Sequence, residues 1–452
     1  RKVCIVIAGF TCTFNANFGA TMPSGALDAI SDHFGVTNKT HLVLLNSLYM
    51  IGYIIGPLIF GPLSEKIGRQ PVMIGTFLGY LIFMLACSGA PTYGALLAFR
   101  TLGGLNAAAP NVVLAGLYSD VLEDPSIRGN ALSLYMFITN VGALTGPAIS
   151  GFSSTLSWRW PFWIASMVAA VGSPFVLTLP ETFAPVLQLR YEKQCRKEGD
   201  MVQAEKVASQ GAKPVSLDAK KIFLRPFKML VTEPALLSTS AYITLAYAVF
   251  YLMFQAYPII FQGFYGLSPG LAGLALMPVL LGTFVGFIIF VVFSHLYEQK
   301  RKAGVLWAQK EVYRRLPLAC LASPCMTIAL FWLAWTVYPS TSPFLPMAGG
   351  FFFGLGFQLL VMAMLNLVTD LYKEYSASAH AASGTMRSFG AAFLPLSTQP
   401  MYTNLGRHWP LSILGFFALA MGAIPFIFIY YWPKLTKGGD EEKTERAIEE
   451  TA

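Results

Sequence analysis

The feature that most constrains this chain is a run of about 20 apolar residues that recurs along its whole length. Two such runs, HLVLLNSLYMIGYIIGPLIF and VMIGTFLGYLIFMLAC, flank the short polar stretch GPLSEKIGRQP. A helix of about 20 residues crosses the ~30 Å hydrocarbon core of a bilayer. Alternation typical of strands is absent from the sequence, and lipid admits only helices or closed barrels. The pattern therefore predicts an all-α membrane protein that crosses the bilayer many times.

Apolar runs bounded by glycine, proline and charged residues predict twelve transmembrane helices. Only 12% of the residues are charged, about half of what soluble domains carry. The predicted spans are 2–22, 42–62, 71–90, 93–118, 130–153, 159–180, 233–256, 268–296, 316–337, 343–370, 377–400 and 410–432. This spacing predicts two pseudo-symmetric six-helix bundles, 1–180 and 233–433, a central cytoplasmic loop, 181–232, and a cytoplasmic tail, 434–452.

The distribution of basic residues predicts the orientation, because Lys and Arg stay on the cytoplasmic side. With both termini inside, 26 of the 31 Lys and Arg residues fall in cytoplasmic segments. The glycosylation sequon at Asn38 then lies outside, which predicts a glycoprotein. The net charge of +8 is explained by topology and anionic lipid of the inner leaflet, and nucleic-acid binding is not expected.

Several motifs follow one another in an order that resembles one family. The stretch GPLSEKIGRQP resembles the loop signature after the second span of the major facilitator superfamily, and LAFRTLGGLNAA resembles its fourth-span signature. The stretch VGALTGPAISG resembles the fifth-span signature of antiporters. The segments WRWPFWI, LPET, LVMAMLNLVTDLY and SASAHAASGTMRSFGAAFLP resemble the fungal drug:proton antiporters with twelve spans.

The resemblance implies the major facilitator fold and a gate on the cytoplasmic side that latches the two bundles. The residues that it places in this gate are Gly61, Glu65, Gly68, Arg69, Asp120 and Arg128. The alternative interpretation is a solvated turn whose charges only stop translocation.

Ionisable residues inside a span are costly and mark function. Arg100 in the fourth span and Arg387 in the eleventh are such residues, and the family resemblance makes Arg100 a candidate for proton coupling or for binding an anionic substrate, with Arg387 a candidate for the same roles. The alternative for Arg100 is structural, holding backbone carbonyls of its neighbours. Asp370 ends a polar stripe on the tenth span and is the best placed carboxylate for coupling.

Polar residues repeated every four positions predict the lining of a substrate site, because such residues share a helix face. The candidates are Asn15, Asn46, Tyr49, Tyr247, Tyr251, Gln255, Gln358 and Asn366. Aromatic side chains with few amides suit bulky amphiphiles, whereas the alternative is hydrogen bonding between helices.

The antiporter motif of the fifth span consists of small residues around a proline. Its residues are Gly142, Gly146, Pro147 and Gly151. Glycines four residues apart allow close helix contact, and proline weakens the helix. The resemblance implies a bend that limits leakage; general helix packing explains the motif equally well.

The features and the resemblance together predict a monomeric secondary transporter in the plasma membrane that exports small amphiphilic compounds, driven by protons. The direction of export is what the resemblance implies, chiefly through the fifth-span motif. A carrier for an endogenous metabolite such as an organic acid or a polyamine remains an alternative, as does a sensor without transport. The sequence shows no metal-ligand cluster, no nucleophile paired with a base and no phosphate loop. Neither an enzyme nor a cofactor or metal requirement is therefore expected.

Overall fold

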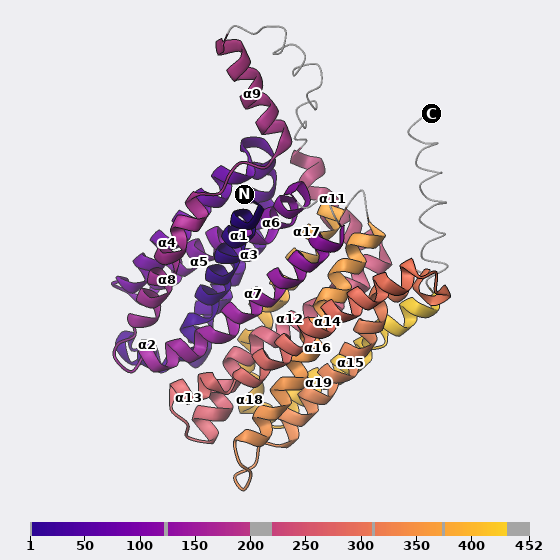
Figure 1. Cartoon of the computed structure of the whole chain (residues 1–452). Helices are drawn as coiled ribbons and strands as arrows, with labels where there is room; N and C mark the ends of the chain where they lie inside the picture. Colours follow the sequence, from indigo (N-terminus) through magenta and orange to yellow (C-terminus); the bar gives the residue numbers. More distant parts are fainter. Residues whose placement is uncertain (1, 122–124, 199–218, 310–311, 373–375, 432–452) are drawn as a thin grey trace. The chain divides into compact units, whose positions relative to one another are not determined.

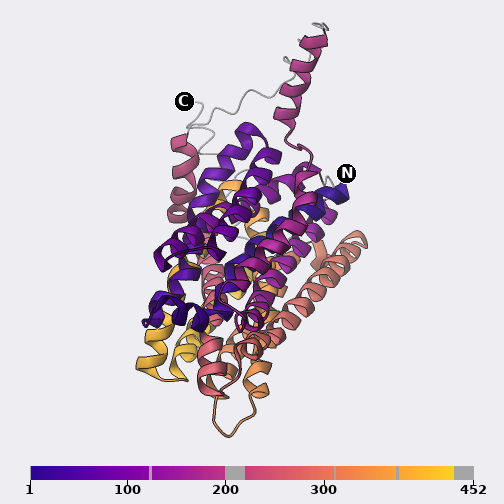
Figure 2. The ribbon, with the colours of Figure 1, turned by 90° about the vertical axis from the view of Figure 1, so that its left-hand side faces the viewer.

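The computed structural model describes residues 2–121, 125–198, 219–309, 312–372 and 376–431. Within these ranges the secondary structure is helical, with no strand. Figures 1 and 2 show long helices running side by side, and α9 (Ala184–Glu198) projecting away from the other helices of its own unit.

The first six predicted spans are all formed, with small shifts at their ends. Their elements are α1 (Lys2–Thr21), α3 (Lys39–Ile67), α4 (Arg69–Ser88), α5 (Tyr93–Ala107) continued by α6 (Ala109–Val121), α7 (Pro125–Ser153) and α8 (Trp160–Leu177). Short helices η1 (Met22–Gly25) and α2 (Leu27–Phe34) follow α1.

The second six spans are also helical, and three of them are built from more than one piece. Their elements are α12 (Pro234–Tyr257) continued by the π-helix η2 (Pro258–Phe264), α13 (Pro269–Leu274) with α14 (Met277–Lys302), α15 (Val312–Trp335), α16 (Phe344–Leu371), α17 (Ser376–Phe393) with η5 (Leu394–Ser397) and α18 (Thr398–Leu405), and α19 (Trp409–Met421). Between the two sets, α11 (Ala219–Thr232) precedes α12, and η3 (Leu306–Gln309) lies between α14 and α15.

The chain divides into two compact units. The first comprises residues 1–225, 251–277 and 391–400, and the second comprises 226–250, 278–390 and 401–452. The first unit thus contains the first six spans together with η2, α13 and η5 from later in the chain. The boundaries predicted at residues 180 and 233 divide the chain by the order of its spans along the sequence, and they stay a prediction.

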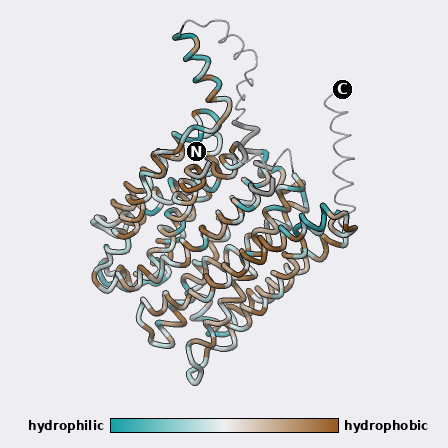
Figure 3. Tube along the Cα trace, in the orientation of Figure 1, coloured by the Kyte–Doolittle hydropathy of each residue, from teal (hydrophilic) through white to brown (hydrophobic). Residues whose placement is uncertain are grey.

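Ten helical segments of the described residues are long and apolar enough to cross a membrane. The two predicted spans missing from this set have identifiable reasons. The fourth is interrupted at Ala108 and contains Arg100, and the eleventh contains His380 and Arg387 among small polar residues. Figure 3 shows the apolar residues concentrated along the long helices, whereas α9 is largely hydrophilic.

The polar turn expected over 61–71 is much shorter in the structure. Helix α3 continues to Ile67, Gly68 alone makes the connection, and α4 begins at Arg69. Gly68 has a φ of 106°, which disfavours residues with a Cβ, so a glycine is required at this corner.

Candidate functional site

The guanidinium of Arg100 lies fully buried in the first unit and binds backbone carbonyls. Its Nη1 donates to the carbonyl of Gly19 at 2.7 Å, and its Nη2 donates to that of Ala20 at 2.8 Å. Its Nε donates to the carbonyl of Leu45 at 3.0 Å, and the guanidinium lies 4.3 Å from the ring centre of Tyr49. These contacts match the structural alternative for Arg100.

The sequence of the first span explains why carbonyls are free for Arg100. Pro23 has no N–H, so the carbonyl of Gly19, four residues earlier, lacks its usual helical donor. Helix α1 ends at Thr21, where the last carbonyls of a helix are unpaired in any case. Arg100 therefore supplies hydrogen-bond donors to the unpaired carbonyls at the C-terminal end of α1.

The predicted lining residues of the first unit are buried and partly hydrogen-bonded within it. Asn46 donates to Ser24 Oγ at 2.7 Å, and Tyr49 donates to the carbonyl of Ala16 at 2.7 Å. Asn15 donates to the carbonyl of Thr11 at 2.9 Å. The Tyr49 contact holds α3 against α1 and the Asn46 contact holds α3 against η1, as expected if these residues serve helix packing, whereas Asn15 bonds within α1.

Some polar atoms of this group nevertheless have no hydrogen-bond partner in the part of the chain that the structure describes. They are Asn15 Oδ1, Asn46 Oδ1, Tyr53 Oη and Gln255 Nε2. A buried polar atom without a partner costs about 1–3 kcal/mol. These atoms are therefore available to a bound polar group, and Tyr53 follows Tyr49 at the four-residue spacing of the predicted lining.

The glycines of the fifth span bring α7 against α1. A Cβ added at Gly142 would lie 2.6 Å from the carbonyl oxygen of Phe14, and one at Gly146 would overlap Thr21 Oγ1. Pro147 leaves the carbonyl of Ala143 without a helical donor, and the hydroxyl of Thr21 donates to that carbonyl at 2.7 Å. The side chain of Thr21 in the first span thus supplies the hydrogen bond that Pro147 cannot donate to Ala143.

Gly151 lies at the other contact of α7, against α13. A Cβ at Gly151 would meet the backbone of Pro269, and one at Gly273 would lie 2.5 Å from Cα of Ala148. Helix α7 is therefore in close contact with α1 before Pro147 and with α13 after it, all within the same unit.

We expect the substitution Thr21→Val to lower the stability of the first unit, because the Ala143 carbonyl loses its donor while the volume stays similar. The cost of the orphaned carbonyl is about 1–3 kcal/mol. The thermal unfolding midpoint of the purified protein in detergent measures the effect. Thr145→Val on α7 is the matched control, since Thr145 donates only within its own helix. An equal loss in the two variants would contradict the role of Thr21.

The corner at Gly68 and Arg69 is organised by Glu181, a residue that the sequence did not place in the predicted gate. Glu181 Oε1 accepts from the backbone N–H of Arg69 at 3.0 Å and from those of Thr182 and Phe183 at 3.0 and 3.1 Å. Its side chain is 2% exposed, and Arg190 Nη2 of α9 lies 3.8 Å from Oε2. Glu181 thereby ties the corner to the start of the central loop.

Arg69 points into α6, where its Nη1 donates to the carbonyl of Val113 at 3.1 Å. Its guanidinium also lies 5.4 Å from the ring centre of Phe183. A Cβ at Gly61 would lie 3.3 Å from Val112 Cγ1, so this glycine faces α6 as well. Glu65, one turn before Arg69, is exposed.

Two of the predicted gate residues lie outside the described side chains. These are Asp120 at the end of α6 and Arg128 near the start of α7. Their pairing stays a prediction.

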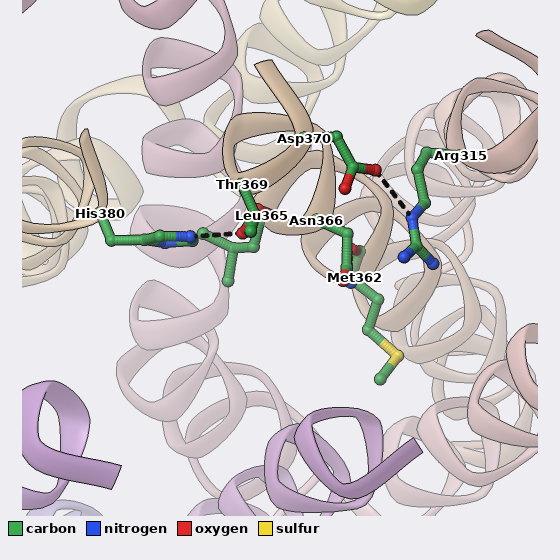
Figure 4. A network of polar contacts seen from close by, with 7 residues as sticks. All are labelled: Arg315, Met362, Leu365, Asn366, Thr369, Asp370 and His380. Carbon is green, nitrogen blue, oxygen red and sulfur yellow. Dashed lines mark hydrogen bonds and ion pairs between the residues drawn. The ribbon is translucent and has the colours of Figure 1, made fainter. Parts of the chain in front are cut away.

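In the second unit, Asp370 pairs with Arg315, which the sequence placed in a cytoplasmic loop. Arg315 Nε lies 3.4 Å from Asp370 Oδ2, and the two side chains are 10% and 30% exposed. Figure 4 shows this pair on one side of α16, with the contact between Thr369 and His380, 2.7 Å long, on the other. Asn366, below Asp370, donates to the carbonyl of Met362 at 2.7 Å.

The other predicted lining residues are distributed over the two units. Gln358 is buried beside Met362, and its Nε2 lies 3.2 Å from the sulfur. Tyr247 lies beside Arg387 in the second unit, whereas Tyr251 and Gln255 are buried in the first. The described residues contain no group of three or more His, Cys, Asp or Glu side chains able to hold a metal ion.

The long apolar helices define the class of this chain as a multi-pass helical membrane protein. Residues 9–395 match the model of the Major Facilitator Superfamily, and this chain belongs to that family. Its members are transporters and not enzymes.

Curated relatives cover nearly the whole chain. The efflux pump FUB11 of Gibberella moniliformis is 34% identical over 440 residues, 95% of this chain and 72% of the relative. The MFS-type transporter traF of Penicillium crustosum is 32% identical over 97% of this chain and 88% of its own. The ascochitine biosynthesis cluster MFS transporter of Didymella fabae is 35% identical over 92% of this chain and 81% of its own.

Solved structures support the fold. The xylose transporter XylE from E. coli, in a partially occluded inward open conformation, has a TM-score of 0.65 at 16% identity. The similarity covers 95% of this chain and 97% of that one. The predicted fold class and family are thereby confirmed.

Proposed function

We propose that this protein exports small amphiphilic compounds, such as drugs, toxins or secondary metabolites, by alternating access of its two six-helix bundles. The observation that carries export is the similarity, over 95% of the chain, to a protein named as an efflux pump. The lining supports an amphiphilic substrate, because buried tyrosines stand among a few amide groups with free hydrogen-bonding atoms.

We further propose that inward proton movement drives export through Asp370. The carboxylate is 30% exposed, so a proton can reach it, and Arg315 lies near its charged form. Protonation removes the attraction between the two side chains and frees α15 from this contact with α16. The ion pair is thus a chemically suitable coupling element.

The remaining parts of the proposal concern the gate and the membrane. The corner at Gly68 and Arg69, seated on α6 and tied to Glu181, supports a cytoplasmic gate that includes Gly61 and Glu65. The excess of basic residues in predicted cytoplasmic segments supports cytoplasmic termini and contact with anionic lipid. A monomer in the plasma membrane, glycosylated at the exposed Asn38, completes the proposal.

Proteoliposomes with an imposed pH gradient test this function. We expect a panel of fluorescent amphiphiles to include compounds whose transport against their gradient requires protons moving the other way. Asp370→Asn should abolish the dependence on the pH gradient while leaving slow downhill exchange. Asp32→Asn, an exposed carboxylate on α2, is the matched control. Transport indifferent to the gradient would remove proton coupling, and no transport of any panel compound would contradict export.

A further inference from the structure

Arg387 occupies the middle of the eleventh predicted span and is partly exposed. Its guanidinium lies 4.9 Å from the ring centre of Tyr247 on α12. Gly384, one turn earlier on the same face of α17, has open space beside it, since an added Cβ would meet no atom within 4 Å. A cation and room for a ligand therefore adjoin each other.

The guanidinium of Arg387 has no hydrogen-bond acceptor and no carboxylate partner within the described residues. The two buried arginines differ from Arg387, because Arg100 binds three carbonyls and Arg315 faces Asp370. A charged side chain at the centre of a span costs about 2.5–3.5 kcal/mol on insertion scales and nearly always has a partner. Among the described residues only the ring of Tyr247 contacts this guanidinium, so its N–H donors are open to an anionic group.

The position of Arg387 deep in its span decides whether its ligand is a soluble anion or a lipid headgroup. Arg387 is eleven residues from the start of α17 at Ser376, which corresponds to roughly 16 Å along a helix axis. An arginine side chain reaches about half that distance, so a headgroup at the membrane surface is out of range for it.

The surroundings hold Arg387 in place for binding. The ring of Tyr247 contacts Phe357 edge-on with centroids 5.2 Å apart, and Phe357 stacks on Phe250 at 4.6 Å. A Cβ added at Gly390 would lie 2.6 Å from Thr244 Cγ2, so α17 is pressed against α12 one turn beyond Arg387. The charged group is therefore preorganised beside a fixed aromatic ring.

We propose that Arg387 binds an acidic group of the transported compound and that the ring of Tyr247 contacts its apolar body. The substrate class is then an organic acid with an aromatic or aliphatic body, bound by a charge-assisted hydrogen bond to the guanidinium. The inference rests on the proposed export function and narrows its substrates from amphiphiles in general to amphiphilic acids.

Binding to the full chain in uncharged detergent tests the proposal. The probes are benzoate, phenylbutyrate and naphthoate, each compared with its primary amide, which has nearly the same shape and no charge. We expect the acids to bind and to raise the unfolding midpoint, and the amides to bind roughly 10- to 100-fold more weakly, as for loss of a hydrogen bond to a charged group. Arg387→Gln should remove this preference, and Arg387→Lys should retain part of it.

Arg301→Gln is the matched control, since it removes one exposed charge from the same unit at the end of α14. Equal binding of acids and amides, or a preference for acids that survives in Arg387→Gln, would overturn the proposal. Competition by phosphatidylglycerol would assign the anion to lipid and would also overturn it. Proton-driven transport of uncharged amphiphiles by the unsubstituted protein in proteoliposomes tests the export function separately from the preference for acids.

Discussion

Replacing Arg100 with lysine is expected to lower the folded fraction of the protein severely, although the positive charge is kept. A lysine carries one ammonium and cannot reproduce the fork that donates to Gly19, Ala20 and Leu45 together. The loss leaves at least two buried carbonyls without a donor, at about 1–3 kcal/mol each, around a charge that is still buried. Size-exclusion chromatography of the solubilised protein before and after heating measures the folded fraction.

Arg100→Leu separates this structural role from a role in transport. The leucine removes the cost of burying a charge, so we expect a smaller loss of folded protein than with lysine, but still a clear one, because the carbonyls stay unpaired. A group that serves only to couple protons or to bind an anion would give the opposite pattern. Arg100→Lys would then fold normally and transport in part, and that result would refute the structural role.

The sequence predicted that Arg100 is buried but left its partners open. Apolar residues on both sides place it inside a span, and the cost of a charge there requires a partner. The identity of the partners depends on Pro23, which frees the carbonyl of Gly19 on a different helix. Proline and arginine are far apart in the sequence, so only the fold brings the freed acceptor to the donor.

The same limit applies to the charged residues at the ends of spans. Arg315 was assigned to a loop because it lies among basic residues, yet α15 begins at Val312 and Arg315 packs beside Asp370. Glu181 lies directly after the predicted sixth span, 159–180, yet it accepts three backbone hydrogen bonds and binds the corner at Arg69. Helix ends are set by hydrogen bonding that hydropathy does not report.

Periodicity succeeded for the helices themselves and for the faces of their polar residues. The stripe of Gln358, Asn366 and Asp370 lies along α16 as its four-residue spacing predicts. The function of a stripe is not encoded in its spacing. Gln358 is packed against a methionine, whereas Asp370 is partly exposed and paired, and only the surrounding helices distinguish these two environments.

Close packing of α3 on α5 was not anticipated from the sequence and leads to the second large expected effect. A Cβ at Gly104 would overlap the backbone of Tyr49, and one at Gly52 would overlap the backbone of Gly104 and Leu105. Backbone atoms cannot rotate out of the way as side chains do. The two helices must therefore separate to accept even one methyl group, and such separation disturbs the neighbouring contact of Tyr49 with Arg100.

We accordingly expect Gly104→Ala to destabilise the protein by about 3 kcal/mol, the upper part of the usual range for overpacking. Gly75→Ala on α4 is the matched control, because its added Cβ would meet no atom within 4 Å. In a helix, alanine is favoured over glycine by roughly 0.5–1 kcal/mol, so the control should be neutral or slightly more stable. The unfolding midpoints of the two variants in the same detergent provide the comparison. Gly104→Ala unfolding at the temperature of Gly75→Ala would show that α3 and α5 are not in backbone contact.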